Sequence, residues 1–225
     1  MKNNIRKYYE AYDDRYKVAH KLGVSWSSNM STPIVIDVIN RYGINNNSSV
    51  LEIGCGEGRD AEVVLKLGYQ IKATDISKEA IRYCKERTVY KDNYRVLNCL
   101  ADKLSEKFDF IYSVAVIHML VLDEDRKRFY EFIRDHLTEN GIALICTMGD
   151  GEVEMKTDIS SAFEIQEREH ESEKMMVAAT SCRMVSFKTF KEELTKSGFA
   201  LLESSLTSSL PDFNNLMYAV VKQSN

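Results

Sequence analysis

The stretch Val50-Leu51-Glu52-Ile53-Gly54-Cys55-Gly56-Glu57-Gly58, residues 50–58, decides how this chain folds. It begins with apolar residues typical of strands, passes through three glycines in alternation, and meets a helical pattern at Asp60. This order predicts a strand, a tight loop and the N-terminus of a helix. The glycines let the backbone turn sharply and let a ligand approach without meeting a Cβ. The sequence therefore predicts a ligand crevice at the carboxyl edge of a parallel sheet.

Two kinds of cofactor compete for such a loop. A dinucleotide fingerprint, G-x-G-x-x-G, would place its third glycine at position 59, which is Arg59 in this chain. The pattern here is G-x-G-x-G, and Glu52, Glu57 and Asp60 surround it. Carboxylates would repel a pyrophosphate, whereas they suit a ligand end that carries an ammonium group. A nicotinamide-dependent oxidoreductase is therefore the alternative interpretation rather than the preferred one.

The glycine loop resembles motif I of the class I S-adenosylmethionine (SAM)-dependent methyltransferases. The resemblance continues through Asp75, Asp102 and Phe108-Asp109, across the middle of the chain. It implies an enzyme with SAM as cofactor and an α/β fold, a Rossmann-like three-layer sandwich. The expected sheet has seven strands and is mostly parallel, with an antiparallel last strand. The predicted strands alternate with helices from Val50 to Phe199, as such a fold requires.

The last two predicted strands, 199–206 and 216–221, are joined by residues 207–215 alone. A parallel pair would need a crossover of about a dozen residues or more, usually helical. The final strand is therefore expected to run antiparallel to its neighbour, in agreement with the family resemblance.

The resemblance places the methionyl end of SAM at the glycine loop. Its expected contacts there are Glu52, Gly54, Cys55, Gly56 and Gly58. Asp75 follows the next strand, 75 − 58 = 17 positions after Gly58, an offset that suits a carboxylate accepting hydrogen bonds from both ribose hydroxyls. Asp75 could instead cap a helix, but Ser77 already fits the capping position. Asp75 is therefore predicted to bind the ribose, and its neighbour Ile76 is a further candidate cofactor contact.

Further site residues follow the third and fourth predicted strands. In the family, residues in the positions of Ala101 and Asp102 meet the adenine, so a strand over 94–100 is expected to deliver them. A solvated turn is the other interpretation of Asp102. Val114 and Ala115 are expected beside the sulfonium. His118 is the candidate general base, because the ordinary pKa of histidine suits proton transfer, although a histidine here also commonly begins a helix.

The N-terminal segment is predicted to form a helix over residues 5–20. Its tyrosines recur at helical spacing, which indicates a helix packed on the core or a wall of the binding site. In similar methyltransferases an N-terminal helix covers the SAM site, so Tyr12 and Tyr16 are candidate cofactor contacts. Trp26, the only tryptophan, is a candidate substrate contact or a core anchor.

The chain is expected to form one methyltransferase domain over residues 1–225. Its predicted parts are a helical cap (1–45), the SAM-binding core (46–150), a lid insertion (151–180) and a C-terminal helix with two strands (181–225). The acidic stretch 152–176 could be a lid over the substrate or a solvated loop.

Composition limits the partners. The net charge is −4 and the pI is about 5.7, and no basic block occurs, so nucleic acid is not expected as a partner. The apolar run 110–122 is too short to span a membrane, and the N-terminus lacks a signal core, so a cytoplasmic protein is expected. Five widely spaced cysteines and four scattered histidines indicate no disulfide framework and no metal site.

The methyl acceptor is expected to be a small molecule. Gly58-Arg59-Asp60 followed by Leu67-Gly68-Tyr69 is similar to methyltransferases of the tellurite-resistance and thiopurine types. The identity of the acceptor, its nucleophilic atom and the oligomeric state stay open. A non-catalytic SAM-binding protein is a further alternative, which only an assay for methylated products would separate.

Overall fold

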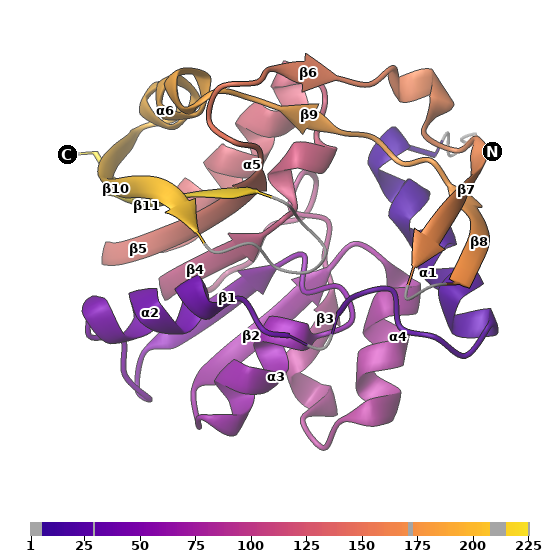
Figure 1. The fold of residues 1–225 in the computed structure, drawn as a ribbon. Coiled ribbons are helices and arrows are strands. Elements are labelled where there is room, and N and C mark those ends of the chain that lie inside the picture. Colours follow the sequence, from indigo (N-terminus) through magenta and orange to yellow (C-terminus); the bar gives the residue numbers. More distant parts are fainter. Residues whose placement is uncertain (1–5, 29, 171–172, 208–214, 225) are drawn as a thin grey trace, which may run out of the picture.

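One sheet of seven strands runs through the described part of this computed structural model, which covers residues 6–28, 30–170, 173–207 and 215–224 (Figure 1). In spatial order the strands are β10 (Phe199–Thr207), β11 (Leu216–Gln223), β5 (Leu137–Met148), β4 (Phe108–Val114), β1 (Ser49–Ile53), β2 (Gln70–Asp75) and β3 (Tyr94–Val96). Five of these strands are parallel, from β5 across to β3. The strand β11 runs antiparallel to both β5 and β10, which confirms the predicted reversal.

The order of the strands reverses beside β1. The chain runs outward from β1 to β2 and β3, then returns to place β4 on the other side of β1. The register joins Leu51 to Lys72 of β2 and to Ile111 of β4. A crevice opens beyond the carboxyl ends of parallel strands at such a reversal. The glycine loop leaves β1 at this point.

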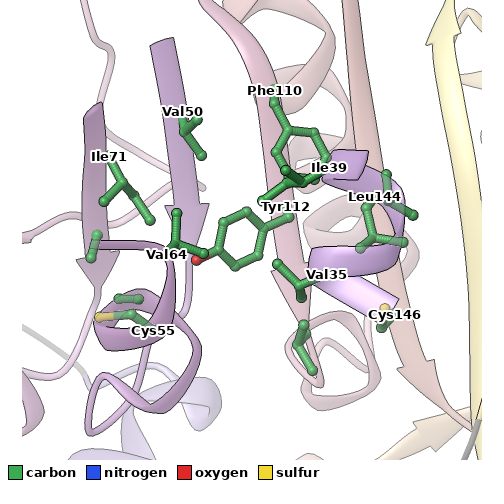
Figure 2. Packing of buried hydrophobic residues seen from close by; sticks show 14 of the residues in the cluster. Val35, Ile39, Val50, Cys55, Val64, Ile71, Phe110, Tyr112, Leu144 and Cys146 are labelled. Atoms are coloured by element: carbon green, nitrogen blue, oxygen red, sulfur yellow. The ribbon is translucent and has the colours of Figure 1, made fainter. Parts of the chain in front are cut away.

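Helices cover both faces of the sheet, because strands buried on both sides need apolar neighbours on each. On one face α2 (Pro33–Arg41), α3 (Arg59–Lys66) and α4 (Lys78–Arg87) share a core cluster with Val50. Figure 2 shows Val35 and Ile39 of α2 directed toward Tyr112 and Leu144 in that cluster. On the other face α5 (Asp123–His136) and α6 (Phe187–Lys196) pack with Leu51. The expected three-layer sandwich is confirmed.

Short polar signals fix where helices begin. Ser77 accepts a hydrogen bond from the N–H of Ala80 at 3.0 Å, and Ser186 accepts one from Thr189 at 3.2 Å. Each therefore satisfies one of the free donors in the first turn of α4 or α6. None of the helices in the described ranges is long and apolar enough to cross a bilayer.

A cover of separate segments lies over the carboxyl edge of the sheet. It consists of α1 (Ala11–Lys21), preceded by the short turn η1 (Tyr8–Glu10), and the hairpin of β7 (Ile165–His170) and β8 (Glu173–Ala178), which lies beside α1 in Figure 1. The short strands β6 (Met155–Lys156) and β9 (Arg183–Met184) pair with each other, and the hairpin lies between them in the chain. The acidic stretch 152–176 therefore contains β6, β7 and the beginning of β8, joined by irregular segments, rather than being a loop throughout.

Candidate functional site

A cavity of about 890 Å³ lies between the carboxyl edge of the sheet and the cover. From the sheet side its lining includes Glu52–Gly56, Asp75, Ile76, 97–100 and 114–116. From the cover it includes Tyr12, Arg15, Tyr16, Trp26, Arg168 and 179–182. Most candidate residues therefore meet in one cavity, although they come from segments far apart in the sequence.

Two glycines of the loop are required by close neighbours. Gly54 has φ 76°, and a Cβ there would lie 2.1 Å from Cγ2 of Val116. Gly56 has φ 53°, and its Cβ would lie 2.7 Å from the hydroxyl oxygen of Tyr16. Both conformations lie in the left-handed region that favours glycine. The loop therefore has no side chain at the two positions where Val116 and Tyr16 lie close to its backbone.

Gly58 differs from the other two glycines. It does not line the cavity, and a Cβ there would lie 2.9 Å from the hydroxyl oxygen of Tyr94 and 3.1 Å from Sγ of Cys84. Its φ of 83° lets the chain enter α3. This glycine allows packing beneath the loop, and its contact with the methionyl end stays a prediction.

Asp75 ties the loop to the end of β2. Its side chain accepts the N–H of Gly56 at 2.9 Å through Oδ2 and the N–H of Ser77 at 2.7 Å through Oδ1. Burial raises the pKa of Asp75 to about 6. A carboxylate oxygen has two lone pairs, so each oxygen can accept a second hydrogen bond from the cavity. The side chain is therefore placed and oriented for a ligand with paired hydroxyl groups.

Glu52 lies at the other end of the loop. It is buried and accepts a hydrogen bond from the hydroxyl of Tyr112 at 3.0 Å. Burial, followed by the nearby charge of Asp60, raises the pKa of Glu52 well above its usual range. A cationic group of a ligand would favour the ionised form of this carboxyl.

Glu57, in contrast, faces away from the cavity lining. Its carboxylate accepts the N–H of Trp26 at 2.8 Å and lies 2.7 Å from Nε2 of His20, whose Nδ1 lies 2.7 Å from Glu79. These contacts connect α1, α4 and the segment of Trp26 to the glycine loop. Glu57 therefore fixes the cover in place rather than attracting the ligand directly.

The segment after β3 differs from the predicted strand over 94–100. The strand ends at Val96 instead of residue 100, and the chain turns as Asp102 N–H donates to the carbonyl of Asn98 at 2.8 Å. The carboxylate of Asp102 accepts the N–H of Asn98 at 2.8 Å and is exposed. Ala101 and Asp102 thus lie outside the cavity lining, where 97–100 take their place.

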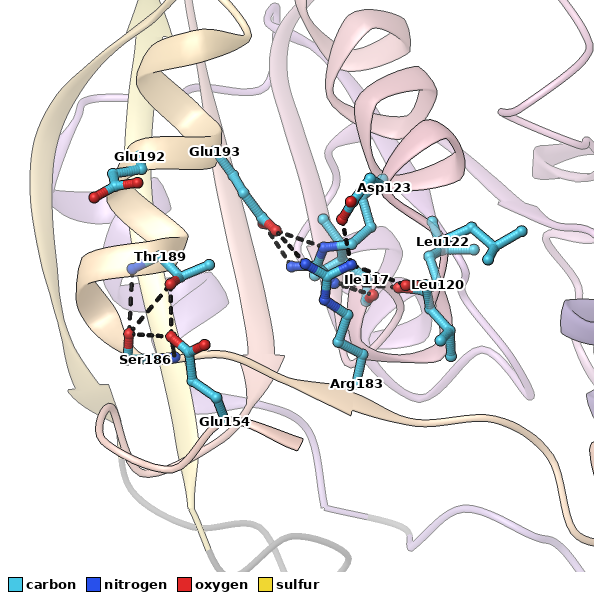
Figure 3. Close-up of polar contacts among 12 residues, drawn as sticks. Ile117, Leu120, Leu122, Asp123, Glu154, Arg183, Ser186, Thr189, Glu192 and Glu193 are labelled. Atoms are coloured by element: carbon cyan, nitrogen blue, oxygen red, sulfur yellow. Dashed lines mark hydrogen bonds and ion pairs between the residues drawn. The ribbon is translucent and has the colours of Figure 1, made fainter. Parts of the chain in front are cut away.

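His118 lines the cavity in the turn η3 (Ile117–Met119) after β4. Burial, together with the charge of Arg126, lowers the pKa of His118 to about 4. Arg126 donates to the carbonyl of Ile117 at 2.8 Å and forms two bonds with Glu193, at 2.8 and 2.6 Å. Figure 3 shows Glu193 directed from α6 toward this turn. The turn that carries His118 is therefore held by a buried ion pair.

Tyr12, Tyr16 and Trp26 all reach the cavity, and Arg15 does so between them. Arg15 was not among the predicted site residues, because a charged residue on an amphipathic helix is usually solvated. Its position three residues after Tyr12 and four before Ala19 places it on the buried stripe, which was an available signal.

Comparison with known proteins decides the family. A family model described as a methyltransferase domain matches residues 28–204. This chain belongs to the SAM-dependent methyltransferases. The probable SAM-dependent methyltransferase TehB of Haemophilus influenzae (strain ATCC 51907 / DSM 11121 / KW20 / Rd) is 29% identical over 119 residues, which are 51% of this chain and 41% of TehB. The match thus spans less than half the length of that relative.

Solved structures share the fold over most of the chain. A SAM-dependent methyltransferase from Clostridium acetobutylicum ATCC 824 superposes with a TM-score of 0.67 at 14% identity, covering 96% of this chain and 99% of that one. The glycopeptide N-methyltransferase MtfA, in complex with SAM, gives 0.62 at 17% identity, covering 84% and 87%. At such identities the likeness shows the fold alone. The family match favours SAM over the nicotinamide cofactor as the ligand of this chain.

Proposed function

We propose that this chain transfers the methyl group of SAM to a small-molecule acceptor bound under the cover. The observation that carries the proposal is the single cavity that joins Asp75 and the bare glycine loop to the aromatic side chains of α1. Its volume of about 890 Å³ lies within the range of about 300–1,000 Å³ found for small-molecule sites.

The residues present fit the cofactor. Asp75 would accept the ribose hydroxyls on the lone pairs left by its two backbone donors. Gly54 and Gly56 would let the methionyl end approach the backbone, and Glu52 would compensate its ammonium group. Apolar side chains at Ile76, Leu97 and Leu100 would border the adenine. Val114 and Ala115 would lie beside the sulfonium, and Cys55 would line the loop.

The chemistry requires alignment more than activation. When bound, SAM supplies an already electrophilic methyl group on a sulfonium. The residues of the chain hold the acceptor in line with that methyl and keep water out, through Tyr12, Tyr16 and Trp26 of the cover. With a pKa of about 4, His118 is a weak base at neutral pH. We therefore assign His118 to contact with the acceptor rather than to removal of its proton.

The division of labour between parts of the chain follows from this assignment. We propose that 46–150 bind SAM, that α1 and 151–180 form the cover, and that 181–225 complete the sheet and its second helical layer. The predicted cap 1–45 is not uniform, because α2 within it packs on the face of the sheet. The cytoplasmic location and the absence of a nucleic-acid partner stay predictions from composition.

Calorimetry with SAM and with NAD tests the cofactor. We expect Asp75→Ala to weaken SAM binding by at least ~1 kcal/mol, because it removes a charged acceptor from two hydroxyls. Asp102→Ala is the matched control, since its carboxylate is exposed and outside the cavity. Binding of NAD alone, or equal SAM affinity in both variants, would refute the assignment.

Mass spectrometry of extract incubated with isotopically labelled SAM tests methyl transfer. SAM binding without any labelled product would indicate a non-catalytic protein.

A further inference from the structure

Two guanidinium groups face the cavity from the cover. Arg15 of α1 is only 5% exposed, and its guanidinium donates to the carbonyl of Ala178 at 3.2 and 2.6 Å and to that of Ala179 at 2.8 Å. It also donates to the hydroxyl of Thr180 at 3.1 Å. Arg168 of β7 lines the same cavity. Every one of these hydrogen-bond acceptors of Arg15 is a neutral oxygen.

Among the described residues, neither guanidinium forms an ion pair with a carboxylate. With the side-chain amide of Gln166 turned so that both of its ends find partners, its oxygen accepts hydrogen bonds from Nε and Nη2 of Arg168 at 2.9 Å. Burial lowers the pKa of Arg15, and the charge of Arg168 lowers it further, so the two groups are close enough to repel each other. Among the described residues that line the cavity, Glu169 is the one acidic residue contributed by the cover. The charge of Arg15 is buried, whereas Arg168 is exposed. A buried charge without a counter-charge is costly, and an anion bound beside Arg15 would relieve that cost.

Flat apolar groups stand beside the charge. The guanidinium carbon of Arg15 lies 4.8 Å from the ring centroid of Tyr12 and 4.7 Å from that of Trp26. Met119 and Leu120 contribute apolar surface to the same cavity. Aromatic faces favour a flat ligand body, while a guanidinium fork favours a carboxylate. The cover thus combines aromatic faces with guanidinium groups, the two features that would recognise an aromatic or similarly flat acid.

We propose that the methyl acceptor carries a carboxylate next to a flat apolar ring, and that Arg15 and Arg168 bind this carboxylate. This specificity rests on the proposed methyltransferase function. The position of both arginines on the cover assigns them to the acceptor, because Asp75 and the glycine loop hold the opposite side of the cavity. The carboxylate of SAM itself is the other source of such an anion, and the experiment separates the two.

The test uses the full chain saturated with S-adenosylhomocysteine and compares benzoate with benzamide, which share shape but differ in charge. By calorimetry or ligand-observed NMR, benzoate is expected to bind at least about fivefold more tightly than benzamide, as a charge-assisted pair requires. Arg168→Met is expected to remove this preference and leave S-adenosylhomocysteine affinity unchanged. Lys174→Met is the control, because Lys174 lies on the neighbouring strand and pairs with Glu167 outside the cavity.

Each other outcome overturns the proposal in a recognisable way. Equal binding of benzoate and benzamide would show that the cover does not select an anion. A loss of S-adenosylhomocysteine affinity in Arg168→Met would assign the cation to the cofactor carboxylate instead. Failure of the unmodified chain to bind S-adenosylhomocysteine at all would refute the proposed function rather than the anion site alone.

A second variant tests Arg15. Arg15→Lys keeps the charge but loses the planar guanidinium that donates to the carbonyls of Ala178 and Ala179. It is expected to lower benzoate affinity while retaining part of the preference for benzoate over benzamide.

Discussion

The titration of Asp75 gives a prediction that the structure lets us calculate. Asp75 is 8% exposed, and burial raises its pKa from the ordinary 3.8 to about 6. Between these values the folded chain binds more protons than the unfolded chain. The stabilising contribution of protonated Asp75 is therefore fully present below pH 3.8 and is lost as the pH rises through about 6. The full difference corresponds to about 3 kcal/mol.

The perturbation is Asp75→Asn, which cannot titrate. Comparing its free energy of unfolding with that of the unmodified chain cancels the other ionisable groups. With the two pKa values above, the stability of Asp75→Asn relative to the unmodified chain is expected to increase by about 1.4 kcal/mol between about pH 5 and about pH 7.5. Urea denaturation followed by circular dichroism at both pH values measures this double difference.

The same group links stability to binding. Ribose hydroxyls would donate to the ionised carboxylate, so SAM affinity is expected to fall as the pH drops below about 6. Asp75→Asn should bind SAM more weakly and with little pH dependence in this range. Asp102→Asn is the control with an exposed carboxylate. A stability difference that is the same at both pH values would show that burial does not hold Asp75 in its protonated form, and the reasoning would fail.

Two further predictions concern the supports of the site. Glu193→Gln removes the charged partner of Arg126, which is 1% exposed, so this substitution should lower the free energy of unfolding in urea by about 2 kcal/mol or more. Glu192→Gln, on the exposed side of α6, is the control and should change the free energy of unfolding by less than about 0.5 kcal/mol. Similar losses in both variants would contradict the buried pair. Gly56→Ala should weaken SAM binding, because it adds a Cβ at φ 53° that meets the Tyr16 hydroxyl at 2.7 Å. Adding Tyr16→Phe should restore part of that affinity in calorimetry, and unaltered binding by Gly56→Ala alone would show that the loop tolerates a side chain.

Local sequence patterns were sufficient for the framework. The apolar run into alternating glycines predicted β1, its loop and α3, and Ser77 marked the start of α4. The short connection before β11 predicted its reversed direction. Each of these features depends on neighbouring residues alone, since a turn, a cap or a strand direction is fixed by bonds and sterics within a few positions.

The direction of side chains into the cavity required the tertiary structure. The residues at 97–100 look like a strand continuing toward Asp102, but the chain turns at Asn98 and carries that carboxylate away from the cavity. The partners of Arg15, at Ala178 and Ala179, lie 163 and 164 positions away, so no local pattern could pair them. Composition and spacing set which elements form. Which groups meet around a ligand depends on how distant elements pack, because burial and charge compensation act through space rather than along the chain.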